Sequence, residues 1–523
     1  MRARQTVEKL GAVCFFLTVA CAQGQRLPEI QWQRSFGGST NDIIRAVKQT
    51  GDGGYILGGP SASGVSGNRT NVNFGTNDFW VVKVDANGNK QWDKAFGGTG
   101  DDFLYDLQLT SDGGYLLGGY STSSFSGNKA TTSYGLSDFW IVKLDANGNK
   151  QWEKVFGGSG VDELHVIQPT SDGGYILGGD SASGISGNKT AAGYGGVDYW
   201  LVKVDANGNK QWDRAFGGTM TDGLYALQQT TNDSGFILGG FSYSGVSGNK
   251  GTANFGFSDA WLVKVDSSGN MQWEQAYGGS SIDGIDALDT LRQTSDGGYI
   301  LGIGSYSGAT GNKTSAGFGA SDLWLVKTDS NGVKEWEQAF GGSHFDYFRC
   351  LQLTDDGGYM LGSGSESLVT GNKSSTNYGA ADYWILKLDS NGNEQWEQTF
   401  GGSTHDSFFN LQLTSDGGYV LGGYSQSGVS GSKTTTNFGG RDFWLVKLWT
   451  PVRFNSYSLA VNNEFQAQLS GLPGSNYILQ ASTDLTNWTS LITNTAAPDG
   501  LVNFSDSNAS SFPFQFYRAQ QQP

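Results

Sequence analysis

One tryptophan-containing phrase, W-x-x-x-[FY]-G-G, recurs along the 523-residue chain and limits its possible folds more than any other feature. Its tryptophans stand 60 to 63 residues apart, at Trp32, Trp92, Trp152, Trp212, Trp273, Trp336 and Trp396. Internal repeats of this length indicate a solenoid, a propeller or an array, in which neighbouring copies bury a shared core. The chain length alone, which favours about three ordinary domains, is therefore a poor guide to this sequence.

Each copy contains four runs with the composition of β-strands. In one copy these runs occupy residues 103–110, 114–121, 138–145 and 150–158. The turns between the first two runs and between the last two carry Asp-Gly or Asn-Gly pairs, which tolerate the positive φ angles of tight hairpins. The connection over residues 122–137 is longer and rich in Gly, Ser and Thr, which predicts a surface loop. The sequence therefore predicts four antiparallel strands in each copy.

The third strand is apolar on both of its faces. Trp140, Val142 and Leu144 alternate with Phe139 and Ile141, so the sheet has to be covered on two sides. Face-to-face packing against a neighbour on each side, as in a propeller, achieves this. The composition points to the same all-β class, because a helical protein has far more Ala, Leu, Glu and Lys than a chain with 81 glycines and 16% charged residues.

The two ends of the repeat region are offset by one strand. The region begins with a fourth strand around Trp32 and ends with a third strand at Asp442 that has no fourth strand behind it. If these two strands pair, twenty-eight strands form seven blades of four, and no sheet edge stays open as it does in an array. The sequence therefore predicts a seven-bladed β-propeller closed by pairing of its N- and C-terminal strands, followed by a small β-sandwich.

The repeat also resembles a known group of proteins. Its pattern DGGYILGG…DFWLVKLDxNGNxQWxxxFGG is similar to the repeats of secreted bacterial β-propeller proteins and, more loosely, to Kelch-type repeats. The resemblance covers about residues 30–449. It implies the propeller fold and no particular activity, because propellers host many functions.

The two ends of the chain differ from the repeats. Residues 1–22 have a basic start, a short apolar run and the small residues of an A-x-A cleavage site, which predicts a secretory signal peptide and a secreted or cell-surface protein. A lipid anchor on Cys21 is the alternative. We assign residues 23–450 to the propeller and residues 451–523 to a β-sandwich that resembles fibronectin type III-like modules of exported bacterial proteins. Cys350 is the one cysteine left in the mature chain, so we expect no internal disulfide.

The charge of the chain excludes several partners. The formal net charge is −16, and no run of Lys or Arg follows the first dozen residues. Nucleic acids and anionic membranes both need a basic footprint, so neither is an expected partner. The apolar run near the N-terminus is too short for a membrane span, and we expect a monomer.

An aspartate follows each Gly-Gly pair by four residues and precedes the first strand of the next blade. These residues are Asp42, Asp102, Asp162, Asp222, Asp283, Asp346 and Asp406. One interpretation is a ring of carboxylates on the loop face that binds a ligand, or a cation such as calcium. The other is that each side chain accepts hydrogen bonds inside its own loop, as in an Asx turn. A ring spread around an axis supplies few oxygens to any one ion, so we predict no cofactor.

The histidines are the remaining candidates for chemistry. His344 and His405 lie in the loops that follow two consecutive Gly-Gly pairs, and we add them to the candidate binding residues of the loop face. They lack a third ligand at a fixed spacing, so we predict no metal site. His165 occupies the place that Tyr105 and Tyr225 hold in other copies, which predicts a packing role.

The repeats differ from one another mainly in their loops, whereas catalysis needs an asymmetric cluster of groups. We therefore expect an exported binding or scaffold protein that recognises a glycan, a peptide or a partner protein through one propeller face. The alternatives are a hydrolase or lyase that acts on polysaccharide at the propeller mouth, and a structural cell-surface or adhesion component.

Overall fold

The computed structural model describes residues 27–523, except residues 286, 288, 450–452, 461–463, 472–473, 475, 498–499, 512–514 and 522–523. The predicted signal peptide, residues 1–22, lies outside the described residues. The chain divides into two compact units. The first comprises Trp32–Gln412 and Val420–Lys447, and the second includes Leu448–Pro523.

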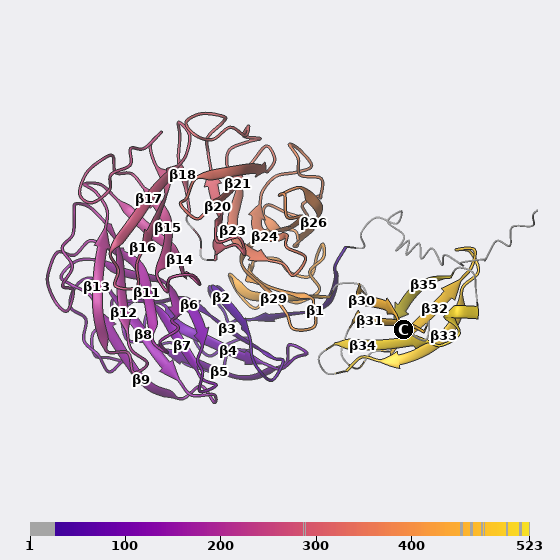
Figure 1. The fold of residues 1–523 in the computed structure, drawn as a ribbon. Helices are drawn as coiled ribbons and strands as arrows, with labels where there is room; N and C mark the ends of the chain where they lie inside the picture. The colour runs from indigo at the N-terminus through magenta and orange to yellow at the C-terminus, as the bar shows by residue number, and fades with distance from the viewer. Residues whose placement is uncertain are drawn as a thin grey trace, which may run out of the picture. The chain divides into compact units, whose positions relative to one another are not determined.

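The first unit consists of antiparallel sheets that follow one another around its centre in a propeller-like arrangement (Figure 1). Two of these sheets are β2(Ala46–Gln49), β3(Tyr55–Ser61), β4(Asp78–Val84), β5(Lys90–Phe96), and β6(Asp102–Leu109), β7(Tyr115–Ser121), β8(Asp138–Leu144), β9(Lys150–Phe156). The next two are β10(Asp162–Pro169), β11(Tyr175–Ser181), β12(Asp198–Val204), β13(Lys210–Phe216), and β14(Asp222–Gln229), β15(Phe236–Ser242), β16(Asp259–Val265), β17(Met271–Tyr277). The predicted all-β class and the four-stranded repeat are confirmed.

The fifth sheet departs from the pattern because its first strand is interrupted. Its strands are β18(Asp283–Gly284), β19(Leu291–Gln293), β20(Tyr299–Ser305), β21(Asp322–Thr328) and β22(Lys334–Phe340). The inserted segment between β18 and β19 contains Asp289, whose carbonyl accepts a hydrogen bond from the backbone of Leu351 in the next sheet at 2.9 Å. The Asp289 carboxylate also accepts one from Asn410 at 3.3 Å. The insertion therefore links three sheets near the centre of the unit.

The last two sheets contain both ends of the repeat region. One consists of β23(Asp346–Leu353), β24(Tyr359–Ser365), β25(Asp382–Leu388) and β26(Glu394–Phe400). In the other, β27(Asp406–Leu413), β28(Tyr419–Ser425) and β29(Asp442–Trp449) are joined by β1(Glu29–Phe36), which lies beside β29 (Figure 1). Gln33 of β1 accepts a hydrogen bond from the Trp444 indole at 3.0 Å, as Asp93 of β5 does from Trp80 at 3.2 Å.

Neighbouring sheets pack face to face through their third strands. Trp140 and Val142 of β8 lie in a cluster with the preceding sheet, whereas Phe139 and Ile141 lie in a cluster with the following one. The predicted two-sided burial of this strand is thus correct. A tilted pair of rings with centroids 4.6 Å apart recurs at several of these contacts, and Trp80 makes the same contact with Phe443 of β29.

The tight turns have the chemistry that their sequences predict. Asp85 accepts backbone hydrogen bonds from Asn87 and Asn89 at 2.9 and 2.8 Å, which is an Asx-type turn. Gly88 has a φ angle of 77° there, a conformation that few other residues adopt without strain. This turn needs no bound calcium to explain it.

The second unit contains two three-stranded sheets that share one hydrophobic cluster. The sheets are β30(Arg453–Leu459), β31(Phe465–Ser470), β34(Leu501–Asp506), and β33(Thr489–Thr495), β32(Asn476–Ser482), β35(Phe516–Gln521), and a short helix η1 spans Ala509–Ser511. Phe465 and Tyr517 stack across the cluster at 3.8 Å. The resemblance to fibronectin type III-like modules stays a prediction. Among the described residues, no helix is both long and apolar enough to cross a bilayer.

Candidate functional site

The seven recurrent aspartates are internal to their loops. Asp102 accepts hydrogen bonds from the backbone of Gly98 at 2.7 Å, from the Ser123 hydroxyl at 2.8 Å, and from Ser121. The same glycine and serine contacts recur at the other copies, and Asp42, Asp102, Asp162, Asp222, Asp283, Asp346 and Asp406 are all fully buried. None of the seven carboxylates is exposed to solvent in this geometry. The structure therefore supports the interpretation in which each aspartate accepts hydrogen bonds inside its own loop.

A second buried carboxylate begins each third strand. In Asp138, Oδ2 accepts a hydrogen bond from the backbone of Tyr134 at 2.7 Å, while the buried Oδ1 has no hydrogen-bond partner. The Oδ1 atom lies where a Cβ on Gly157 would stand, which explains the first glycine of the Gly-Gly pair. Burial, with a smaller effect of the neighbouring recurrent aspartate, raises the pKa of Asp78, Asp382 and Asp442 to about 7, and of Asp138, Asp198 and Asp259 to about 6.

These raised pKa values predict how stability depends on pH. The native state binds more protons than the unfolded chain between pH ~4 and ~7, so stability falls as the pH rises through this window. The carboxylates with lowered pKa values, such as Asp93 at about 2, lose their contribution only below that window. We expect the melting temperature at pH 8 to be several degrees below that at pH 5. A melting temperature that rises between pH 5 and pH 8 in calorimetry contradicts this account.

The two loop histidines do not form a site together. His344 is exposed, and its Nδ1 lies 3.0 Å from the hydroxyl of the adjacent Ser343. His405 stacks on Tyr424 at 5.8 Å, and burial together with the charge of Arg441 lowers its pKa. Within the described ranges, no three side chains of His, Cys, Asp or Glu are grouped as metal ligands.

A different repeated position carries chemically diverse side chains. It lies three residues after each recurrent aspartate, and its occupants are Arg45, Tyr105, His165, Tyr225, Arg349 and Phe409, with the fifth copy outside the described residues. In four sheets the register between the first and second strands shifts at this residue, which makes Tyr105, His165, Tyr225 and Arg349 the extra residue of a β-bulge. A bulge bends the strand and redirects a side chain, and bulges are frequent beside functional sites. We name these six residues the central cluster.

The arginines of the central cluster lie over aromatic rings. The Arg45 guanidinium is 4.2 Å from the centre of the Phe409 ring and 5.3 Å from that of Tyr105. The Arg349 guanidinium lies over Phe409 at 5.5 Å and over Tyr347 at 5.5 Å. Residues from the first, second, sixth and seventh sheets of the unit thus meet in one place. The rings stabilise the two guanidinium cations, because the face of an aromatic ring is negative.

The rest of the central cluster continues this row of rings. His165 lies between Tyr105 at 4.7 Å and Tyr225 at 4.2 Å, and its Nδ1 donates to the carbonyl of Leu224 at 3.0 Å. His165 is buried, as the predicted packing role requires. Its Nε2 has no hydrogen-bond partner in the described residues, and the Glu163 and Asp180 carboxylates lie 3.9 and 3.7 Å from the ring nitrogens.

The electrostatics differ between the two sides of the central cluster. Burial lowers the pKa of Arg45 to about 10, and the like charge of Arg349 acts in the same direction. On the other side, burial opposes protonation of His165, but Asp180 and Glu163 outweigh it and raise the pKa of that histidine. Burial raises the pKa of Asp180 to about 6. The centre of the unit is therefore cationic on one side and acidic on the other.

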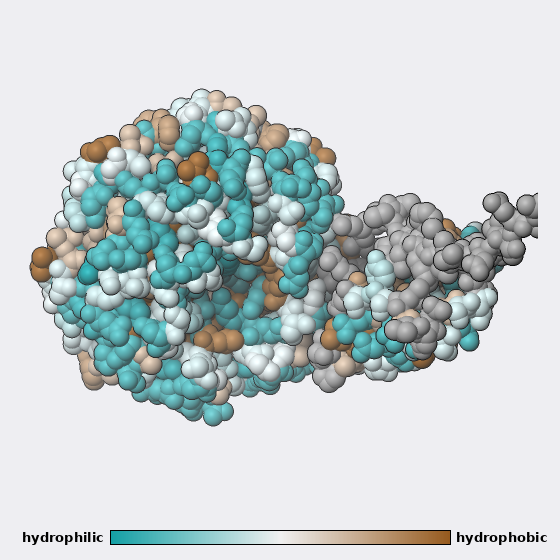
Figure 2. All heavy atoms as spheres, in the orientation of Figure 1, coloured by the Kyte–Doolittle hydropathy of each residue, from teal (hydrophilic) through white to brown (hydrophobic). Residues whose placement is uncertain are grey.

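The central cluster is open enough to meet a solute. Arg45, Tyr105, Tyr225, Arg349 and Phe409 are each partly exposed. Figure 2 shows that the face of the first unit turned toward the viewer is hollowed near its centre. Such a lining can hold a ligand by stacking on rings, by ion pairing with arginine and by hydrogen bonding to tyrosine hydroxyls.

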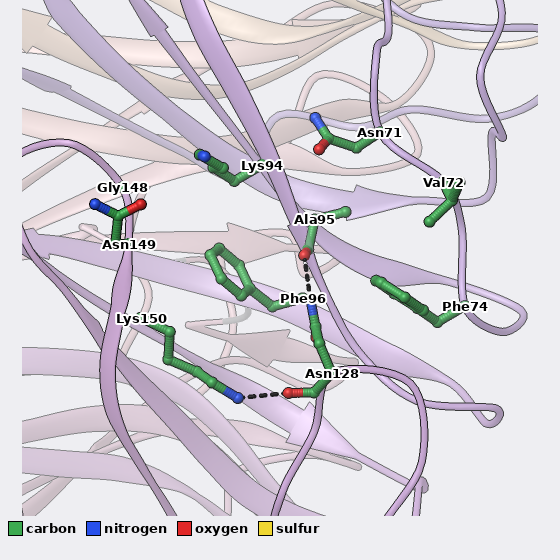
Figure 3. Close-up of a pocket in the computed structure, with 10 residues that line it drawn as sticks. All are labelled: Asn71, Val72, Phe74, Lys94, Ala95, Phe96, Asn128, Gly148, Asn149 and Lys150. Atoms are coloured by element: carbon green, nitrogen blue, oxygen red, sulfur yellow. Dashed lines mark hydrogen bonds between the residues drawn. The ribbon is translucent and has the colours of Figure 1, made fainter.

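A separate depression lies on the outside of the unit and has a structural explanation. Its volume is about 280 Å³, and it is lined by Asn71, Val72, Phe74, Lys94, Ala95, Phe96, Asn128, Gly148, Asn149 and Lys150 (Figure 3). Asn128 donates to the carbonyl of Ala95 at 2.8 Å, and Lys150 is paired with Glu153 at 2.6 Å. These polar groups already have partners inside the protein, so we do not assign a ligand to the depression.

The central cluster was missed in the sequence because the repeat hid it. The aspartate recurs without change, which made it the evident candidate. The position three residues later varies, and only His165 was considered there, as a packing residue. Variation at a fixed repeat position, from Arg45 to Tyr105 to His165, is the signal that could have found it.

Comparisons with known proteins give a partial match. No family model matches the chain. A segment is 26% identical over 215 residues to the regulatory protein FlaEY of Caulobacter vibrioides (strain ATCC 19089 / CIP 103742 / CB 15), covering 39% of this chain and 22% of that protein. The chain thus spans about a fifth of the length of that relative.

Solved structures are similar at a low level. BBS1N, solved in complex with ARL6DN, has a TM-score of 0.40 and 10% identity, and the match covers 82% of this chain and 98% of that one. Puromycin hydrolase has a TM-score of 0.43 and 11% identity, with 83% and 60% covered. The partner and the substrate in these names belong to those proteins.

Proposed function

We propose that this protein is an exported, non-catalytic binding protein, in which seven four-stranded sheets close into a β-propeller and a ligand is held at the centre of the ring. The observation that carries the proposal is the central cluster. Six residues of four kinds, Arg, Tyr, His and Phe, converge on the centre from one repeated position, and a purely structural repeat has no need for such diversity.

Contacts between the last sheet and the first support the closed ring. Phe438 packs against Gly67 of the long loop of the first sheet, as Phe74 packs against Gly127 and Tyr134 against Gly187 in later copies. Trp32 of β1 lies against Gly88 in a turn of the first sheet, as Trp92 lies against Gly148 and Trp152 against Gly208 in the sheet that follows each of them. The strand β1 therefore occupies the place of a fourth strand.

A second candidate function is a hydrolase or lyase that acts on polysaccharide. One observation favours it: the buried His165 lies beside the carboxylates of Glu163 and Asp180. Neighbouring titratable groups whose surroundings shift their pKa values differently are typical of catalytic acid and base pairs. Product analysis separates this candidate from binding alone.

The test uses a chain without residues 1–22 and a panel of neutral, acidic and amino-sugar oligosaccharides and short peptides. Calorimetric titration is expected to detect binding of at least one probe without a new product after long incubation. Tyr225→Ala is expected to weaken this binding at least tenfold, since loss of one stacking contact with the rest of the site intact is worth about that much. Tyr134→Ala, an exposed loop aromatic, serves as the control. Product formation favours the enzyme, and an absence of binding, or binding insensitive to Tyr225→Ala, contradicts the proposal.

A further inference from the structure

Arg45 and Arg349 differ from other arginines that the structure places inside the first unit. Arg69 lies 3.9 Å from the buried carboxylate of Asp42, and Arg292 lies 2.8 Å from that of Asp289. Neither Arg45 nor Arg349 forms an ion pair with any carboxylate of the described residues, and the buried Nε of Arg45 has no hydrogen-bond partner there.

Two guanidinium groups that share the Phe409 ring repel each other unless an anion lies between or beside them. A partly desolvated cation without a counter-charge is costly, and stacking on rings compensates for only part of that cost. Among the described residues no carboxylate forms an ion pair with either arginine, so an anionic ligand can supply the counter-charge.

The chemistry of the surroundings limits which anion fits. The chain as a whole carries a net charge of −16, so an extended polyanion is repelled beyond the immediate surroundings of the two arginines. A guanidinium presents two parallel N–H donors that match a carboxylate. The flanking rings of Phe103, Tyr105 and Phe409 offer flat apolar surface beside that carboxylate.

The acidic side of the centre constrains the rest of the ligand. Glu163 and Asp180 repel a second anionic group but accept hydrogen bonds from hydroxyls. The hydroxyl of Tyr120, 3.0 Å from Asp101, adds a further polar group near Phe103. A ligand with one carboxylate at one end, an apolar ring face and hydroxyls at the other end matches this arrangement.

On these observations we infer that Arg45 and Arg349 bind the carboxylate of an acidic sugar, a hexuronate unit, with its ring stacked on the aromatic side chains of the central cluster. This inference rests on the proposed function and names the chemical class of its ligand. Arg45 and Arg349 supply the counter-charge, Phe409 and Tyr105 the stacking surface, and Glu163 and Asp180 the acceptors for sugar hydroxyls.

The test compares a sugar acid with its neutral counterpart. Calorimetric titrations of the chain without residues 1–22 use galacturonate and its trimer, galactose and its trimer, and acetate. We expect the acidic trimer to bind at least tenfold more tightly than the neutral trimer or acetate. Arg45→Gln and Arg349→Gln are each expected to weaken it at least tenfold, because each removes a charge-assisted pair. Arg214→Gln, which removes an arginine stacked on Trp212 at 5.5 Å, is the matched control.

The melting temperature of each variant without ligand is a second measurement, which distinguishes a loss of binding from a loss of folding. Without ligand, Arg45→Gln is expected to melt at or above the wild-type temperature, because it removes an unpaired charge. Equal binding of acidic and neutral trimers overturns the inference, as does acetate binding as tight as that of the acidic trimer. If neither trimer binds while another probe binds in a Tyr225-dependent way, the inference fails and the proposed function stands. If nothing binds, both fail.

Discussion

A chain that starts at Ser39 is expected to melt at least ~10 °C below the full-length protein and to aggregate on heating. The truncation removes β1, and with it Phe36, which is buried in a cluster with Phe443 and Trp80. Loss of one such aromatic side chain costs ~3–5 kcal/mol, and each kcal/mol lowers the melting temperature by about 2–4 °C in domains of 150–250 residues.

The truncation also uncovers polar groups. The Trp444 indole loses its acceptor on Gln33, and the backbone of β29 becomes an open sheet edge, which invites pairing with another chain. A chain that starts at Leu27 and keeps β1 is the control and is expected to melt as the full-length protein does. Differential scanning calorimetry with light scattering measures both effects. A Ser39 chain with wild-type melting and no scattering contradicts the role assigned to β1.

The second large effect is expected from Gly119→Val in β7. A Cβ at this position stands 1.9 Å from the carbonyl oxygen of Phe103, a backbone atom that cannot move aside without breaking the pairing of β6 with β7. Overpacking in a core ordinarily costs ~1–3 kcal/mol, and a collision with backbone lies at or above the upper end. We expect a loss of ~3 kcal/mol or more in denaturant unfolding.

Gly184→Ala is the control for this substitution. No atom lies within 4 Å of a Cβ built on Gly184, so the free energy of unfolding is expected to change by no more than ~0.5 kcal/mol. In the fifth sheet, Ile303 stands at the equivalent place, where the opposing strand is interrupted between β18 and β19. Equal stability of Gly119→Val and Gly184→Ala contradicts the predicted close approach of the two strands.

Much of the first unit could be predicted because every copy repeats the same local chemistry. The alternation of Trp140 and Val142 with Phe139 and Ile141 indicated burial on two faces, and those residues do lie in two different clusters. Turn glycines such as Gly88 fixed the ends of the hairpins. Third strands begin at the predicted aspartates, for example Asp138 in β8 and Asp442 in β29.

The candidate site could not be predicted in the same way. A β-bulge depends on pairing register, so the inward direction of Tyr105 or His165 is not visible in an alternating pattern. The burial of Asp42 and Asp102 depends on serine hydroxyls about 20 residues further along the chain, which loop composition does not reveal. The insertion containing Asp289 could be recognised in the sequence because it lengthens the fifth copy of the repeat. Its contact with Asn410, 121 residues away, could not be recognised there.

The central cluster exists only if the first and last sheets meet, because Arg45 comes from the first sheet and Phe409 from the last. A direct measurement of this junction is a disulfide between β1 and the loop before β29. The Ser35 and Thr435 hydroxyls lie 2.8 Å apart, a separation compatible with a disulfide after substitution of both residues by cysteine. In a chain without residues 1–22, which contain Cys14 and Cys21, the remaining Cys350 is buried and does not compete. Mild oxidation of Ser35→Cys/Thr435→Cys is expected to give a quantitative intramolecular disulfide in the monomer, seen by peptide mass spectrometry. Thiols that stay free in the native protein, or bonds that form only between molecules, contradict the closed ring and the site at its centre.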